Sequence, residues 1–254
     1  MTSHIPHGQR ASKYGGILAD FWEDSPIIDV QEARILSEIV RQSGTPALEI
    51  GCGSGRLLVP LATEGLLVDG IEPGPELASL CRERLTKLRS RSQVHLQRLQ
   101  SLALPRKYST VYASKGVFQL ITSTAEVLDS IANIRRVLAP GGTLAVSFVN
   151  LEEAFENPVT DWLPISGERG RQDRWCGKYL WRRVGVVGGV EAAEIRRAPP
   201  GHAESAQLES RIYREQDAVT LLRGNGFSSV NVVQLGPLAR NPMERRDFVV
   251  IAKV

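Results

Sequence analysis

The chain has 254 residues, a length typical of one elaborated domain or of two small ones. Its 42% hydrophobic and 23% charged residues lie close to the average of globular domains, which excludes global disorder. A net charge of +3 is too small to indicate nucleic acid as a partner by itself.

The amino-terminal segment predicts a flexible tail followed by two helices. Residues 1–13 are polar and lack the apolar stretch of a signal peptide, so we expect a tail and no export signal. A short helix is predicted over residues 15–22, ending at the breaker Asp24-Ser25-Pro26. A second helix is predicted over residues 30–41 from a single apolar stripe, formed by Ile35, Leu36, Ile39 and Val40.

The next part of the chain, residues 47–150, alternates between short apolar runs and amphipathic stretches. The apolar runs predict strands over residues 47–50, 66–71, 94–96, 109–113 and 143–149. The amphipathic stretches predict helices over residues 56–63, 76–90 and 126–138. Pro140-Gly141-Gly142 predicts a turn into the strand over residues 143–149. This alternation is typical of βαβ units, so we predict an α/β fold with a doubly wound, mostly parallel sheet.

The pattern changes after Asn150. Residues 151–206 are rich in Trp, Arg, Gly and Pro, and strands are predicted over residues 177–187, 190–197 and 207–214. We expect residues 151–214 to form a small antiparallel β cap, a substrate insert laid over the main sheet. Residues 215–254 are expected to complete the core sheet, with a helix over 215–224 and a strand pair over 230–235 and 247–252.

A glycine-rich loop joins the first predicted strand of the sheet to its helix, with the sequence Leu48-Glu49-Ile50-Gly51-Cys52-Gly53-Ser54-Gly55. Glycine permits a positive φ in a tight turn and lets a ligand approach bare backbone. At the carboxyl end of a parallel strand, such a loop lies where ligands bind. A turn without a ligand is the plainer interpretation, but it does not require three alternating glycines. Replacing Gly51 with Val is therefore expected to abolish ligand binding and leave the fold largely intact.

The spacing of this loop separates the classes of ligand. The dinucleotide pattern is G-x-G-x-x-G, and Arg56 stands here where its third glycine would be. A phosphate-binding P-loop is excluded, because no Gly-Lys-Ser or Gly-Lys-Thr occurs. Glu72 ends the second strand of the sheet, about 20 residues beyond the loop, where an acid can accept hydrogen bonds from ribose hydroxyls. Alone it is as readily a surface turn residue, but with the loop it predicts a nucleoside site.

On these motifs, residues 47–149 resemble the class I methyltransferases that use S-adenosylmethionine (SAM). The glycine-rich loop matches that family's first motif, and Gly70-Ile71-Glu72-Pro73 matches the second. Residues 102–108, 118–120 and 138–144 match the later core, and residues 13–22 are similar to a helix that many members fold over the cofactor. The resemblance implies a Rossmann-like methyltransferase fold with a seven-stranded sheet. Residues 14–46 would cover the cofactor site, and residues 47–150 would form the SAM-binding core.

The resemblance also implies SAM as cofactor, S-adenosylhomocysteine as product and no metal. Tyr14 would approach the carboxylate or sulfonium, Leu99 would pack on the adenine, and Lys115 would face the methionine amine through its carbonyl. One departure is Arg98, which stands where many members have an Asp that reaches the adenine amine; Gln100 is its candidate replacement. The full set of implied cofactor-binding residues is Tyr14, Glu49, Gly51, Cys52, Gly53, Glu72, Pro73, Leu99, Gln100 and Lys115.

Aromatic residues in and near the cap are candidates for the acceptor pocket. Their faces suit a flat or cationic acceptor, although they suit the cap's own core as well. A general base is needed only when the acceptor is protonated or weakly nucleophilic, and Tyr14 and His202 are the catalytic candidates. The candidate acceptor-binding residues are Trp22, Phe118, Trp175, Tyr179, Trp181 and Tyr213.

We therefore predict methyl transfer to a small-molecule acceptor, an aromatic or heteroaromatic natural-product intermediate, at carbon, nitrogen or oxygen. Three alternatives stay open: an amino sugar or other amine as the acceptor, RNA as the acceptor, and a SAM-binding regulator without catalysis. The basic residues that would favour RNA, Arg82, Arg84, Lys87, Arg89 and Arg91, also suit a solvated helix face. The predicted partners otherwise include neither nucleic acid nor membrane, and the chain is expected to be a monomer or homodimer.

The three cysteines of the chain, an odd count without a C-x-x-C pair, argue against a disulfide framework or a structural zinc site. They fit a cytoplasmic protein. No window reaches the roughly 18 consecutive apolar residues of a membrane span.

Overall fold

The computed structural model describes residues 14–24, 30–164, 178–198, 205–236 and 247–254. The helices are α1 (Ile17–Asp24), α2 (Val30–Ser43), α3 (Leu58–Thr63), α4 (Pro75–Lys87), α5 (Thr124–Val137) and α6 (Glu215–Gly224). Short 3-10 turns are η1 (Leu99–Ser101), η2 (Val117–Leu120) and η3 (Glu152–Phe155). These helices agree with the predicted ones to within a few residues at each end.

The core is a seven-stranded sheet in the order β10-β11-β5-β4-β1-β2-β3. Neighbouring strands from β5 to β3 run parallel, whereas β11 pairs antiparallel with both β5 and β10. The predicted α/β fold with a mostly parallel sheet is confirmed. Its strands are β1 (Ala47–Ile50), β2 (Val68–Ile71), β3 (Val94–His95), β4 (Tyr108–Ala113), β5 (Leu138–Phe148), β10 (Asn231–Gln234) and β11 (Phe248–Lys253).

Helices cover both faces of this sheet, because successive side chains of a strand point to opposite faces. Leu48 of β1 packs in the cluster that includes α5 and α6, whereas its neighbour Ala47 packs in the cluster that includes α2, α3 and α4. Val111 and Tyr112 of β4 divide in the same way. The sheet is therefore wound on both sides, which leaves the carboxyl ends of its strands as the open edge.

One local prediction was wrong at the start of β5. Pro140-Gly141-Gly142 was expected to form a turn before the strand, but β5 already begins at Leu138. Tyr108 pairs with Leu138 and Thr110 pairs with Thr143, so the register shifts between these two positions of β4. Gly141 has a φ of +71°, and this conformation lets the extra residues bulge inside one strand instead of separating two elements.

A second, antiparallel sheet has four strands in the order β6-β7-β8-β9. Its strands are β6 (Leu163–Pro164), β7 (Tyr179–Val187), β8 (Val190–Arg197) and β9 (Ser205–Arg211), of which β6 was not predicted. Its interior holds a charge: Arg183 is 2% exposed, and its guanidinium pairs with Glu191 at 2.6 Å and with Glu153 at 3.3 Å. The predicted antiparallel cap is confirmed, whereas the domain boundaries drawn from the sequence stay predictions.

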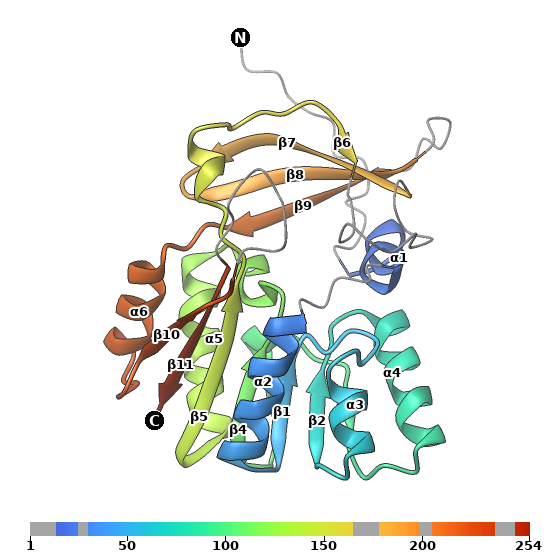
Figure 1. Cartoon of the computed structure of the whole chain (residues 1–254), viewed down its shortest axis with the longest axis vertical. Helices are drawn as coiled ribbons and strands as arrows, with labels where there is room; N and C mark the ends of the chain where they lie inside the picture. The colour runs from blue at the N-terminus through green and yellow to red at the C-terminus, as the bar shows by residue number, and fades with distance from the viewer. Residues whose placement is uncertain (1–13, 25–29, 165–177, 199–204, 237–246) are drawn as a thin grey trace.

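The cap lies at the carboxyl edge of the core sheet, with α1 beside it (Figure 1). Gln119, which follows β4 in η2, is 1% exposed, and its side-chain amide donates to the carbonyls of Val149 and Arg211. These two carbonyls lie just after β5 and at the end of β9, so one glutamine joins the core to the cap. Phe21 of α1 packs edge-on against Tyr179 of β7, with ring centroids 5.4 Å apart.

Candidate functional site

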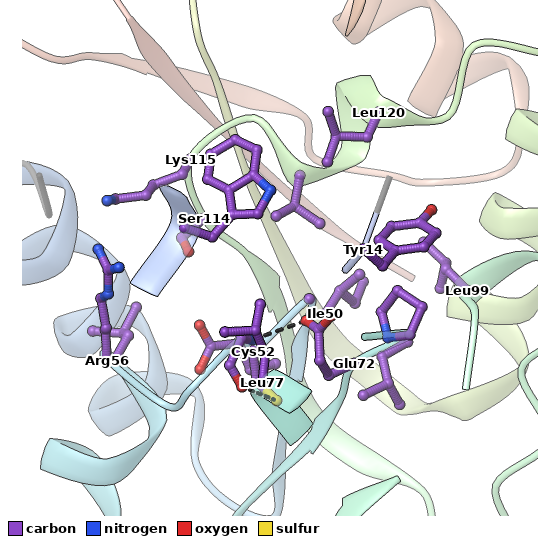
Figure 2. Close-up of a pocket in the computed structure, with 18 of the residues that line it drawn as sticks. Tyr14, Ile50, Cys52, Arg56, Glu72, Leu77, Leu99, Ser114, Lys115 and Leu120 are labelled. Carbon is purple, nitrogen blue, oxygen red and sulfur yellow. Dashed lines mark hydrogen bonds between the residues drawn. The ribbon is translucent and has the colours of Figure 1, made fainter. Parts of the chain in front are cut away.

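A hollow opens where β1, β2 and β4 end, beneath the cap and α1 (Figure 2). Its walls come from the loops after β1, β2, β3 and β4, together with Tyr14, Trp22 and the start of α2. In open α/β sheets, this edge is where ligands bind. All of the implied cofactor-binding residues line this hollow, which brings together segments from residue 14 to residue 115.

The three glycines of the loop after β1 meet three different surroundings. A Cβ on Gly51 would lie 2.5 Å from the Cγ1 atom of Val117, and one on Gly55 would lie 2.6 Å from the sulfur of Cys81. A Cβ on Gly53 would meet no described atom within 4 Å. All three have a positive φ. Gly51 and Gly55 are therefore required by the protein's own packing, and Gly53 is the position that leaves backbone bare toward open space.

This arrangement corrects the expectation for Gly51. A valine there would collide with Val117 in a backbone conformation that β-branched residues rarely adopt. Its first effect would fall on folding, so the substitution cannot isolate ligand binding. The sequence pattern alone does not distinguish a glycine that faces a neighbouring side chain from one that faces a cavity.

Glu72 lies at the end of β2, is 5% exposed and points into the hollow (Figure 2). Its two carboxylate oxygens accept hydrogen bonds from the backbone N–H of Gly53 at 3.0 Å and of Gly74 at 2.8 Å. Burial raises the pKa of this carboxyl, and the two backbone donors lower it in part. Each oxygen keeps a lone pair for a ligand, so Glu72 both holds the glycine loop and offers acceptors to the hollow.

Glu49 forms the floor of the hollow and is 2% exposed. It accepts a hydrogen bond from the hydroxyl of Tyr112 at 3.1 Å, and the backbone of Leu58 donates to it as well. Burial raises its pKa well above the ordinary value for a glutamate. Glu49 thus connects β1 to β4 and to the first turn of α3. It lies directly before the glycine-rich loop.

The wall beside Glu72 is formed by η1 and Tyr14 (Figure 2). Asn133 of α5 holds this wall, because its side-chain amide donates to the carbonyls of Leu99 and Gln100 at 2.9 and 3.0 Å. The guanidinium of Arg98 lies over the ring of Tyr14, 5.4 Å from its centroid. Burial raises the pKa of the Tyr14 hydroxyl, so it stays protonated near neutral pH.

Lys115 and Arg56 form the opposite side of the hollow (Figure 2). Lys115 follows β4 with a φ of +52°, unusual for a residue with a side chain. Its backbone N–H donates to the carboxylate of Glu32 in α2 at 2.6 Å. Burial, followed by the charge of Arg56, lowers the pKa of the Lys115 ammonium to about 7.

The aromatic residues predicted for the acceptor pocket are not gathered in the hollow. Trp22 lines it. Phe118 and Tyr213 instead pack with Phe148 in the core beneath η2, with ring centroids 5.2 to 6.2 Å apart. Tyr179 and Trp181 pack in the cluster between the cap and α1, where the Tyr179 hydroxyl donates to Asp24 at 3.0 Å. Trp175 and the catalytic candidate His202 lie outside the described residues.

Three residues that position the site were missed from the sequence: Glu32, Arg56 and Asn133. Glu32 is a charged residue in a polar first turn of a helix, so nothing in the pattern indicates that it is 5% exposed and bonded to Lys115. Arg56 was noted only as an obstacle to a dinucleotide. Asn133 does interrupt the apolar stripe of α5, which is the one signal that could have indicated a buried polar role.

Among the described residues, no cluster of His, Cys, Asp and Glu could hold a metal ion. In the same part of the chain, every helix is too short or too polar to cross a membrane.

Comparison with known proteins agrees with this geometry. A family model described as a methyltransferase domain matches residues 48–144. The chain is 26% identical over 171 residues to a ubiquinone biosynthesis O-methyltransferase of Pseudomonas putida (strain W619), covering 65% of this chain and 70% of the relative. It is 29% identical over 148 residues to the protein of the same name from Xylella fastidiosa (strain 9a5c), covering 54% of this chain and 58% of the relative.

Solved structures share the fold over almost the whole chain. A SAM-dependent methyltransferase from Clostridium acetobutylicum superposes with a TM-score of 0.69 at 11% identity, covering 93% of this chain and 96% of that one. CalS10, an amino pentose methyltransferase from Micromonospora echinaspora, superposes with a TM-score of 0.64 at 18% identity, covering 95% and 98%. Residues 48–144 thus match a methyltransferase domain, the curated relatives are O-methyltransferases, and the chain shares its fold with SAM-dependent methyltransferases.

Proposed function

We propose that the chain binds SAM in the hollow at the carboxyl edge of β1, β2 and β4 and methylates a small-molecule acceptor there. One observation carries the proposal: the buried carboxylate of Glu72 and the bare backbone of Gly53 face one cavity from adjoining strand ends. A ribose requires such an acceptor for its hydroxyls, and a nucleoside chain that lies close to the loop requires backbone without a side chain. The residues fit the cofactor, because a Cβ added at Gly53 would meet no atom of the described residues within 4 Å.

Bound SAM would supply an electrophilic methyl group on a sulfonium, and the chain's own residues would bind, orient and exclude water. Glu72 would accept from the ribose hydroxyls, and the wall of Leu99 would pack on the adenine. The hydroxyl of Tyr14, protonated near neutral pH, would act as a hydrogen-bond donor in the hollow and not as a base. The main contribution of a protein to such a transfer is to align the acceptor with the methyl group and the sulfonium and to exclude water.

For the acceptor we propose an aromatic or heteroaromatic intermediate, with an amine-bearing molecule as the second candidate. Trp22 lines the hollow and offers a face to a flat acceptor, and the curated relatives given above are named as O-methyltransferases of ubiquinone biosynthesis. An amine is supported by three carboxylates that line the hollow, Glu32, Glu49 and Glu72. It is also supported by the likeness in fold to CalS10 and to the sugar N-methyltransferase KedS8 from Streptoalloteichus sp.

The basic residues at the end of α4 give RNA little support as an acceptor, because two of the five are already paired. Arg84 pairs with Glu23 at 2.7 Å and donates to the carbonyl of Ser54, and Lys87 pairs with Glu83 at 2.7 Å. Charges that are already paired contribute little to the attraction of a phosphate backbone.

The proposal is tested by transfer of a radiolabelled methyl group from SAM to three acceptor panels: phenolic and heteroaromatic compounds, amino sugars, and total RNA. We expect turnover on a small molecule, with the heat-treated protein as the blank. Label incorporated into RNA alone would overturn the small-molecule assignment, and turnover on the amino sugars alone would select the second candidate.

Replacing Glu72 with Ala is expected to weaken the binding of S-adenosylhomocysteine (SAH) by about 1–3 kcal/mol, because charged hydrogen bonds to the ribose are lost. The substitution also removes the acceptor for the N–H groups of Gly53 and Gly74, which adds to the loss. Isothermal titration calorimetry measures the effect. Glu76→Ala is the matched control, because Glu76 is an exposed glutamate in the first turn of α4. Equal affinities in the two variants would show that the ribose lies elsewhere.

Cofactor affinity is expected to fall as the pH is lowered through the pKa of Glu72. Burial raises this pKa from its ordinary value of 4.5, so the carboxylate protonates earlier than an exposed one. The ionised form accepts hydrogen bonds on both oxygens, so affinity is complete above the raised pKa and is lost below it. Titrations of SAH into the wild-type protein over a series of pH values that descends toward the ordinary glutamate pKa of 4.5 should show this loss, and Glu72→Ala should flatten it. A flat profile in the wild-type protein would contradict the role.

A further inference from the structure

The guanidinium of Arg56 carries a buried donor that the described part of the chain does not satisfy. Its Nη2 atom is shielded from solvent and has no hydrogen-bond partner there. Arg56 lines the hollow and comes directly after the glycine loop. An unpaired buried donor on a charged group costs more than a neutral one, so it persists where a ligand completes it.

Lys115 brings a second cation to the same place. Its side chain and that of Arg56 extend along one side of the hollow, away from Glu72 and Leu99 (Figure 2). The two charges are close enough for Arg56 to lower the pKa of Lys115, in addition to the larger effect of burial. Two like charges in a partly buried wall repel each other. An anion between them would attract both and so offset that repulsion.

The carboxylates nearest to this pair are already engaged elsewhere. Glu23 pairs with Arg84 at 2.7 Å through Oε1, and its Oε2 atom has no partner among the described residues. Asp24 accepts from the hydroxyl of Tyr179 at 3.0 Å and pairs with Lys178. Glu32 accepts the backbone N–H of Lys115 through one oxygen at 2.6 Å. Within the described part of the chain, none of these three carboxylates forms an ion pair with the side chain of Arg56 or Lys115.

We propose that Arg56 and Lys115 form a carboxylate-binding subsite at the end of the hollow opposite Glu72. A planar guanidinium beside an ammonium suits the two oxygens of a carboxylate. The carboxylate belongs to the methionine part of the cofactor or to the acceptor. The inference rests on the proposed function in one respect, because it takes the hollow to be the place where cofactor and acceptor meet.

The experiment compares probes with and without a carboxylate by calorimetry. S-adenosylhomocysteine carries the amino-acid carboxylate, and 5′-methylthioadenosine keeps the nucleoside and the thioether but lacks it. A second pair, 4-hydroxybenzoate and its methyl ester, is titrated into protein saturated with S-adenosylhomocysteine. Each probe is measured on the wild-type protein, on Arg56→Gln and Lys115→Met, and on the control Arg34→Gln. Arg34 lies exposed on α2, outside the residues that line the hollow.

If the carboxylate is the cofactor's, both site variants bind S-adenosylhomocysteine about 10- to 100-fold more weakly and leave 5′-methylthioadenosine within about twofold of the wild type. If it is the acceptor's, the nucleosides bind as before, and the variants lose the preference of the wild type for the acid over its ester. The retained binding of 5′-methylthioadenosine shows that each variant is folded. The control should match the wild type throughout.

The subsite is ruled out if the substitutions change neither of two differences in affinity. The first is between S-adenosylhomocysteine and 5′-methylthioadenosine, and the second is between 4-hydroxybenzoate and its methyl ester. That result would mean that the buried donor of Arg56 is satisfied inside the protein, for instance through water to the unpartnered Oε2 atom of Glu23. Failure of the proposed function gives a different pattern, because the wild-type protein would then bind neither S-adenosylhomocysteine nor 5′-methylthioadenosine.

Discussion

Replacing Gly53 with Val is expected to weaken S-adenosylhomocysteine binding by at least about 100-fold, which corresponds to roughly 2.7 kcal/mol. A side chain at this position would stand in the open space beside the loop, where an added Cβ meets no described atom within 4 Å. The protein can therefore accommodate the valine when no ligand is bound. The bound nucleoside would compete with the valine for the same space, so the loss should appear in affinity and much less in stability.

The matched control is Gly188→Val in the turn between β7 and β8. Gly188 has a φ of +57° against +53° for Gly53, and it too has no described atom within 4 Å of an added Cβ. Both valines are strained by about 1–3 kcal/mol in this conformation, so both variants should lose similar stability in thermal unfolding. Only Gly53→Val should lose affinity in calorimetry. Equal affinities for the two variants would mean that the ligand does not approach the loop.

Replacing Gly51 with Val is expected to act on folding instead, by about 2–6 kcal/mol. The backbone strain of about 1–3 kcal/mol is joined by overpacking of similar size, because the added Cβ would lie 2.5 Å from Val117. For a domain with a total stability of about 5–15 kcal/mol this is a large fraction. Differential scanning calorimetry should record a melting temperature lower by on the order of 10 °C.

The control for Gly51 is Gly65→Val, after α3. Gly65 has a φ of +84°, but an added Cβ there meets no described atom within 4 Å. It therefore carries the backbone strain without the collision. If Gly51→Val melts no lower than Gly65→Val, then η2 moves aside easily and Val117 does not fix the loop.

The core sheet and its loops could be predicted from the sequence because each rests on a local pattern. Runs such as Ala47–Ile50 end in glycines, and the alternation with helices leaves little choice of topology. The same locality explains the error at Pro140-Gly141-Gly142. A turn and a bulge use the same residues, and only the pairing of Tyr108 with Leu138 distinguishes them.

The acceptor side of the site could not be predicted, because aromatic residues suit a pocket and a core equally well. Phe118 and Tyr213 are apolar in pattern, and their partner Phe148 comes from a strand that the sequence places far from either. Tyr179 faces α1 for a reason that is visible only in three dimensions, namely the proximity of Phe21 and Asp24. Long-range packing of this kind leaves no periodic trace in a single sequence.

Buried charges were missed for a related reason. Arg183 follows a second arginine in β7, and its burial depends on Glu191 of the next strand and on Glu153 of η3. Glu32 is buried because Lys115, more than eighty residues away, presents a backbone N–H to it. A charged residue looks solvent-exposed in sequence until its partner is known.

A crystal structure with S-adenosylhomocysteine would test the central claim most directly. We expect the ribose hydroxyls within hydrogen-bond distance of Glu72, the adenine against Leu99, and the thioether chain crossing the backbone of Gly53 toward Lys115. A nucleoside bound elsewhere, or the space beside Gly53 closed by the protein's own side chains, would contradict the account.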